Sequence, residues 1–125
     1  MEENCVFCHP QKECNVLFDR MIWKAVLDEY PVSKGHTLII PKEHVETYFD
    51  LSDSQKESLH YVIEEVKRIL DERYHPQGYN IGINCGKAAG QTIPHCHIHV
   101  IPRYDGDVEN PRGGVRGVIP SKQDY

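Results

Sequence analysis

Hydrophobic residues occur in short runs between residues 15 and 40 and again between residues 79 and 101. Between these two regions, after residue 52, they recur with the spacing of a helix. The runs have the length of β-strands and are bounded by turn-forming residues. They cover residues 15–18, 23–27, 37–40, 79–84 and 95–101. The order of strands, helix and strands favours an α+β fold, with an antiparallel sheet that the helix covers on one side.

A capping box predicts where the helix begins, with Ser52 at the N-cap and Gln55 three residues later. Pro76 and Gly78 predict its end. Between them, apolar residues recur every three or four positions and so share one face of the helix. They are Leu59, Val62, Ile63, Val66, Ile69 and Leu70. We expect this face to pack on the sheet.

The length of 125 residues predicts one domain, residues 1–125, with a core at about 5–103 and an irregular tail at 104–125 that is rich in Gly, Pro and charge. The formal net charge is −5, and no basic stripe marks a nucleic-acid surface. No apolar stretch reaches 18 residues and no signal-peptide pattern opens the chain, so we expect no membrane partner and a cytoplasmic location. Five unevenly spaced cysteines fit a reducing compartment.

Three histidines at alternate positions, His95, His97 and His99, are the strongest indication of chemistry. In an extended strand they share one face, while Cys96 and Ile98 lie on the other. Because histidine exchanges protons near neutral pH, such a row indicates proton transfer, nucleophilic attack or metal binding.

The loop before these histidines carries Gly86, Gly90, Gln91 and Thr92. Glycines let backbone N–H groups converge on an anion, and the two polar side chains add donors. A Gly-x-x-x-Gly loop taken alone is more often a plain connection between strands. Next to the histidines, it predicts a phosphate site beside a nucleophile.

At these positions the chain resembles the histidine triad (HIT) superfamily of nucleotide hydrolases and transferases. The resemblance covers about residues 5–103 and rests on Ala-Gly-Gln-Thr at 89–92, His-Cys-His-Ile-His-Val-Ile-Pro-Arg at 95–103, and Gly-His-Thr-Leu-Ile-Ile-Pro-Lys at 35–42. His99 favours the bacterial, Fhit-like or Hint-like branches, because the galactose-1-phosphate uridylyltransferase branch has glutamine there. The resemblance implies a HIT-like fold: a five-stranded antiparallel sheet with one long helix and a short helix, dimerised into a ten-stranded sheet.

The implied activity is hydrolysis or nucleotidyl transfer at the α-phosphate of nucleoside phosphoramidates, dinucleoside polyphosphates or adenylated compounds. His97 would attack the phosphorus to form a covalent nucleotidyl-histidine, and water would then release the nucleoside monophosphate. His99 would contact the phosphate oxygens, and His95 and Gln91 complete the implied catalytic set.

The resemblance also implies how a nucleotide, with a purine base expected, is bound. Asp28 would hold the ribose hydroxyls, although an aspartate there could simply start a turn. Val6, Phe7 and Val26 would wall the base pocket, although apolar residues at these positions would also suit the core. The residues expected around the phosphate are His36, Asn84, Gly90, Gln91, Thr92 and His99.

Cys5 and Cys8 form a Cys-x-x-Cys pair, which on its own could equally bind metal, be redox-active or have no function. The resemblance implies that His44 and His95 complete a structural zinc site with them. A shell of four protein ligands leaves no position for a metal-bound water, so no catalytic metal is expected.

Two other functions stay open at this stage. One is a metal-dependent hydrolase that uses the histidine strand, and the other is a nucleotide-binding sensor or adaptor with little turnover. The leaving group is not readable, because loops and the tail decide it. By resemblance, Arg112 and Arg116 of the tail reach the active site of a dimer partner.

Overall fold

The computed structural model describes Cys5, Phe7 and residues 15–125. Val6 and Cys8, which we expect in the base pocket and the zinc site, lie outside these residues. No helix in the described part of the chain is long and apolar enough to cross a membrane.

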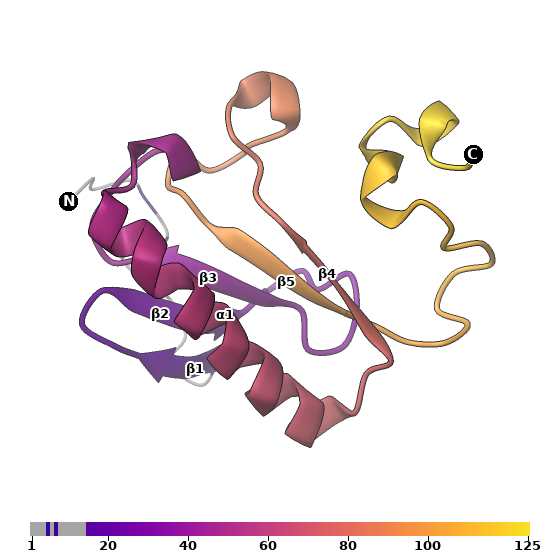
Figure 1. Cartoon of the computed structure of the whole chain (residues 1–125), viewed down its shortest axis with the longest axis horizontal. Helices are drawn as coiled ribbons and strands as arrows, with labels where there is room; N and C mark the ends of the chain where they lie inside the picture. The colour runs from indigo at the N-terminus through magenta and orange to yellow at the C-terminus, as the bar shows by residue number, and fades with distance from the viewer. Residues whose placement is uncertain (1–4, 6, 8–14) are drawn as a thin grey trace.

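The described residues form one antiparallel sheet of five strands in the order β1-β2-β3-β5-β4. The strands are β1 (Val16–Asp19), β2 (Trp23–Leu27), β3 (Thr37–Pro41), β4 (Gly78–Gly82) and β5 (Ile98–Arg103). The last strand, β5, carries His99, directly follows His95 and His97, and lies between β3 and β4 (Figure 1). The predicted α+β class is confirmed.

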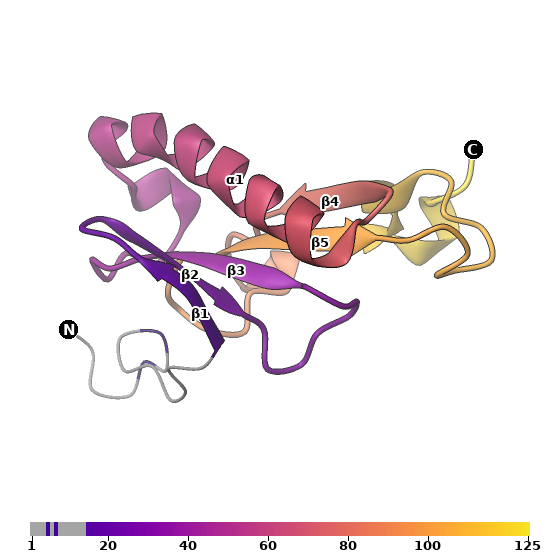
Figure 2. The same cartoon turned by 90° about the horizontal axis from the view of Figure 1, so that it is seen from below.

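The helix α1 (Asp53–Tyr74) covers one face of the sheet (Figure 2). Alternate residues of each strand pack beneath it, and the positions between them face the other side. The core side chains from the strands are Phe18, Trp23, Ala25, Ile39, Ile98 and Val100, and those from α1 are Leu59, Val66 and Leu70. Cys96 joins this core, as the alternation predicted.

The ends of α1 follow from local sequence. The Ser52 hydroxyl accepts the Gln55 backbone N–H, and the Gln55 side chain accepts the Ser52 N–H, so the predicted capping box forms. At the other end His75 adopts a left-handed conformation with φ 52°, directly before Pro76. Since the residue before a proline disfavours the α conformation, the helix ends where the sequence predicts.

Two strands, β4 and β5, differ from the prediction by more than one residue at an end. β4 is Gly78–Gly82 and not 79–84, and β5 begins at Ile98 and not at residue 95. The reason for the later start is that the Cys96 N–H donates to the oxygen of Val45, in the segment after β3, over 2.7 Å. The alternation of side chains nevertheless continues backward from β5 to residue 95.

Other helical segments in the described residues are short 3-10 turns, including Tyr48–Asp50 and Lys87–Ala89. The tail, residues 104–125, was expected to be irregular but contains two such turns, Gly114–Val118 and Pro120–Lys122. It lies beyond β4, apart from α1 (Figure 1).

Candidate active site

A pocket of about 550 Å³ opens on the face of the sheet opposite α1. Its floor combines apolar side chains of β2 and β3, Val26, Leu38 and Ile40, with His97 just before β5 and His99 within it. The other lining residues are Phe7, Asn15, Lys24, Leu27, Asp28, Glu29, Tyr30, Asn84, Thr92 and Ile93.

His97 has a defined tautomer. Its Nδ1 lies 2.8 Å from the backbone oxygen of His95. Because a carbonyl oxygen only accepts hydrogen bonds, Nδ1 carries the proton and, in the neutral ring, Nε2 keeps a free lone pair. The Phe7 ring contacts the His97 ring edge-on, with centroids 4.8 Å apart, and the histidine is 6% exposed. The neutral ring therefore has a nucleophilic nitrogen in a sheltered position.

His99 is held by a chain of hydrogen bonds that begins at the backbone. The Val32 N–H donates to His36 Nδ1 over 3.1 Å. His36 must therefore carry its proton on Nε2, which lies 3.0 Å from His99 Nδ1. His99 accepts there, so its remaining proton lies on Nε2.

Burial keeps both of these imidazoles neutral near pH 7. It lowers the pKa of His99 to about 4, with smaller contributions from His97 and His36. Burial also lowers the pKa of His36, although Asp28, whose carboxylate lies 3.5 Å from His36 Nε2, acts in the opposite direction. In the free protein His99 is thus a neutral hydrogen-bond donor.

A second cluster of side chains surrounds the imidazole of His95. The Nδ1 of His95 is 3.2 Å from Cys5 Sγ and 3.0 Å from His44 Nδ1, and His95 Nε2 donates to the oxygen of Pro41 over 2.8 Å. A tetrahedral zinc would separate such ligand atoms by about 3.3–3.7 Å, close to these distances. Burial lowers the pKa of His95, which favours the neutral form that binds metal. The residues present therefore fit a zinc ion.

The Asp28, His36 and His99 cluster also gathers metal-ligating atoms, within 4.8 Å of one another. Its hydrogen bonds, however, do not suit a metal. A histidine that binds a metal through one nitrogen normally donates the proton on its other nitrogen to an acceptor. His95 meets this condition at Pro41. His36 faces the N–H of Val32, a donor, so a metal on its Nε2 would set two N–H groups against each other.

The loop before the histidines places only part of the predicted set at the pocket. Thr92 lines it, as does Asn84. Gly90 adopts a left-handed φ of 94°. The Gln91 amide accepts the Gly86 N–H and donates to the oxygens of Glu46 and Ile93. Contact between Gln91 and a substrate stays a prediction, and it would replace one of these bonds.

Several polar or aromatic residues of the pocket are not predicted from the sequence, notably Asn15, Lys24, Glu29 and Tyr30. A signal for Lys24 was available, because it lies two residues before Val26 and strand alternation puts both on one face. Lys24 is 7% exposed, and its ammonium group donates to the Phe7 oxygen over 3.2 Å.

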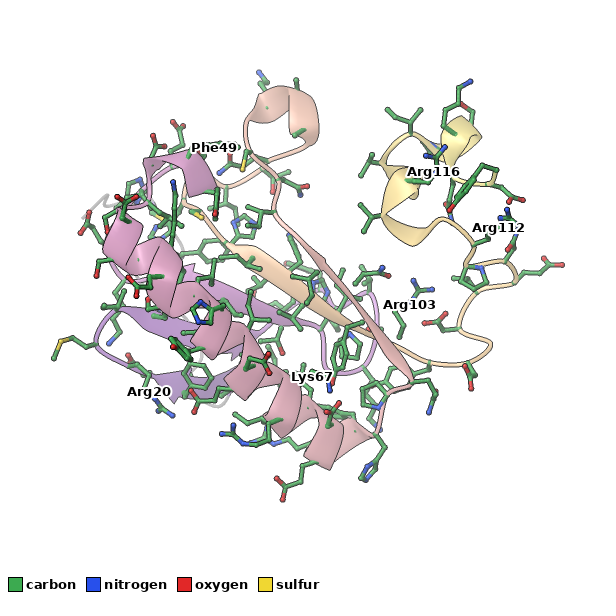
Figure 3. The ribbon with its side chains drawn as sticks, in the orientation of Figure 1. Arg20, Phe49, Lys67, Arg103, Arg112 and Arg116 are labelled. Atoms are coloured by element: carbon green, nitrogen blue, oxygen red, sulfur yellow. The ribbon has the colours of Figure 1, made fainter. Side chains whose placement is uncertain are left out.

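The tail arginines lie away from the sheet in this chain (Figure 3). Arg112 and Arg116 both stack on the Tyr125 ring, at 5.0 and 4.5 Å from its centroid. Arg112 also pairs with Asp124. Their expected place at a partner's active site stays a prediction.

The chain is similar in sequence and fold to known proteins. The family model of the HIT domain matches residues 9–106. The chain is 36% identical over 106 residues to the protein named hit of Bacillus subtilis, covering 82% of this chain and 72% of that one. It is 35% identical over 103 residues to adenosine 5′-monophosphoramidase hnt1 of Schizosaccharomyces pombe, covering 80% and 74%. A zinc-bound histidine triad family protein of Mycobacterium smegmatis superposes with a TM-score of 0.76 at 35% identity, over 86% of this chain and 80% of that one. The extent of the family match and the histidine strand together show that the chain belongs to the HIT family.

Proposed function

We propose that the protein cleaves nucleotide substrates at the α-phosphorus through a covalent nucleotidyl-histidine on His97. The observation that carries this proposal is the 2.8 Å hydrogen bond from His97 Nδ1 to the His95 oxygen. It leaves Nε2 of the neutral ring as the only nitrogen able to attack. The relative named adenosine 5′-monophosphoramidase supports a phosphoramidate as one substrate.

The first step forms a bond between His97 Nε2 and phosphorus and breaks the bond from phosphorus to the leaving group. The leaving group departs with that electron pair and takes up a proton from solvent. In the second step water attacks the same phosphorus and loses a proton to solvent, the electron pair of the P–N bond returns to His97 Nε2, and a nucleoside monophosphate is released. His99 donates from Nε2 to a phosphate oxygen, where charge develops in both steps. Asp28 binds the ribose, and Phe7 and Val26 contact the base.

Cys5, His44 and His95, together with Cys8, hold a structural zinc ion in this proposal. The fit of the three described ligands and the zinc-bound relative support it. Zinc would link the N-terminal segment to His95, whose backbone oxygen orients His97. His95 therefore affects catalysis by positioning His97.

A homodimer in the cytoplasm completes the proposal. β4 is the last strand at one edge of the sheet, where a second copy would have to pair to extend it. Pairing of two β4 strands would give the ten-stranded sheet that the family resemblance implies.

A panel of substrates tests the activity. Adenosine 5′-phosphoramidate, an aminoacyl adenylate, diadenosine triphosphate and diadenosine tetraphosphate are each incubated with the wild type and with His97→Ala. We expect nucleoside monophosphate from at least one substrate, and a loss of several orders of magnitude in His97→Ala with AMP binding retained. AMP binding without turnover of any substrate would favour a sensor and contradict the enzyme.

A further inference from the structure

Tyr30 combines two properties that bear on ligand binding. It lines the pocket, yet its side chain is 84% exposed. Other strongly exposed aromatic residues, such as Phe49 and Tyr61, are not among the pocket-lining residues that the structure describes. An aromatic ring at a pocket rim gains burial only when a ligand covers it.

The backbone around Tyr30 is fixed on both sides. The Tyr30 N–H donates to the Asp28 carboxylate over 2.9 Å, and Val32, two residues later, donates to His36. Pro31 between them restricts its own φ. Because the main chain is held, a ligand that meets Tyr30 has only the side-chain rotamer left to order.

The loop begins at the residue that would hold the ribose. Tyr30 bonds one oxygen of Asp28, while the other oxygen faces His36. With phosphorus at His97 and ribose at Asp28, the base has to lie over the apolar floor made by Val26 and Ile40. Tyr30 lines the same pocket and follows Asp28 by two residues.

We propose that Tyr30 stacks on the base of the attacked nucleotide and sets the preference of the pocket for nucleosides over unadorned sugar phosphates. The proposal rests on the proposed function for the direction in which the nucleotide lies. Stacking uses the π-face of the base, so Tyr30 selects for an aromatic base, and more strongly for the larger purines, without reading its hydrogen-bonding edge.

The test compares substrates with and without a base. The values of kcat/KM are measured for adenosine 5′-phosphoramidate and for ribose 5-phosphoramidate, and the Kd values for AMP and for ribose 5-phosphate, in wild type, Tyr30→Ala and Tyr30→Phe. In Tyr30→Ala, the ratio of kcat/KM for adenosine 5′-phosphoramidate to that for ribose 5-phosphoramidate should fall roughly 5- to 150-fold. The ratio of the Kd for AMP to that for ribose 5-phosphate should rise by a similar factor. Tyr30→Phe should keep both ratios. Phe49→Ala is the matched control, because Phe49 is an exposed aromatic residue that is not among the pocket-lining residues. It should leave both ratios unchanged.

Unchanged ratios in Tyr30→Ala, or equal affinity of the wild type for AMP and ribose 5-phosphate, would overturn the stacking role. The two proposals can fail separately. A rise in the Kd ratio in Tyr30→Ala, without turnover in any variant, would support stacking and contradict the hydrolase. Turnover with ratios that are the same in the wild type and Tyr30→Ala would support the hydrolase and contradict stacking.

Discussion

The imidazole of His97 donates its Nδ1 proton to the backbone oxygen of His95, two residues earlier and 2.8 Å away. His95 in turn offers its own Nδ1 lone pair to the Cys5 and His44 cluster. One residue thus connects the candidate zinc site to the nucleophile, by its side chain on one side and its carbonyl on the other. The three histidines have different environments although their spacing is uniform.

Hydrogen bonds predict which nitrogen carries the proton in the neutral form of three histidines. His97 should carry its proton on Nδ1, whereas His36 and His99 should carry theirs on Nε2, because their Nδ1 atoms accept hydrogen bonds. Long-range ¹H–¹⁵N NMR spectra distinguish the two forms. In His36→Phe the His99 signals should shift towards those of a mixture of the two tautomers, because the N–H that donates to His99 Nδ1 is removed. An Nε2–H tautomer at His97 in the wild type would contradict the assignment of the nucleophile.

Stability should fall in mild acid through His99. Its folded pKa of about 4 lies below the ordinary value of 6.5, so the unfolded chain takes up a proton first as the pH drops. The contribution of His99 is therefore complete above about pH 6.5 and is lost as the pH falls towards 4, by at most about 3 kcal/mol.

Urea unfolding at several pH values measures this effect in the wild type and in His99→Asn at equal zinc content. The pH slope of the unfolding free energy should be smaller in the variant, because that group no longer titrates. Identical slopes would show that His99 is not protected from protonation by the fold.

Gly35 positions the loop that carries His36. Its φ is 90°, and a Cβ there would lie 2.8 Å from the ring of Tyr74. Gly35→Ala should therefore cost at least about 1 kcal/mol of unfolding free energy. Gly82→Ala, at a position with no atom within 4 Å of the added carbon, is the control and should cost less in the same denaturant titration. Equal losses would contradict the close packing of Gly35.

Metal analysis should find about one zinc ion per chain, and a Cys5→Ser/Cys8→Ser variant should lose it. Cys85→Ser removes a partly buried thiol outside the cluster and should keep the metal. Removing zinc with a chelator should also lower the melting temperature, since a bound ion stabilises the folded state. Full zinc content in the double cysteine variant would disprove the site.

The elements that depend on local sequence were predicted well. The capping box at Ser52 and the core face of α1 need only neighbouring residues, and both formed as expected. The start of β5 was misplaced because it depends on Val45, which lies about fifty residues earlier in the chain and captures the Cys96 N–H.

The candidate site was predicted as a set of residues but not as a network. The contact between His36 and His99 joins positions 63 residues apart, and the donor that fixes its direction is the backbone of Val32. A backbone donor leaves no trace in residue identity. Lys24 was missed for a different reason, because a charged residue within a hydrophobic run was taken as part of the strand and not as part of the pocket.

The covalent step is the central claim, and trapping the intermediate tests it most directly. The wild type is mixed with adenosine 5′-phosphoramidate, quenched within milliseconds under conditions that preserve P–N bonds, and digested for mass spectrometry. Adenylate should be found on His97, and His97→Ala should carry none while still binding AMP. Adenylate on another residue, or rapid turnover by His97→Ala, would contradict the account.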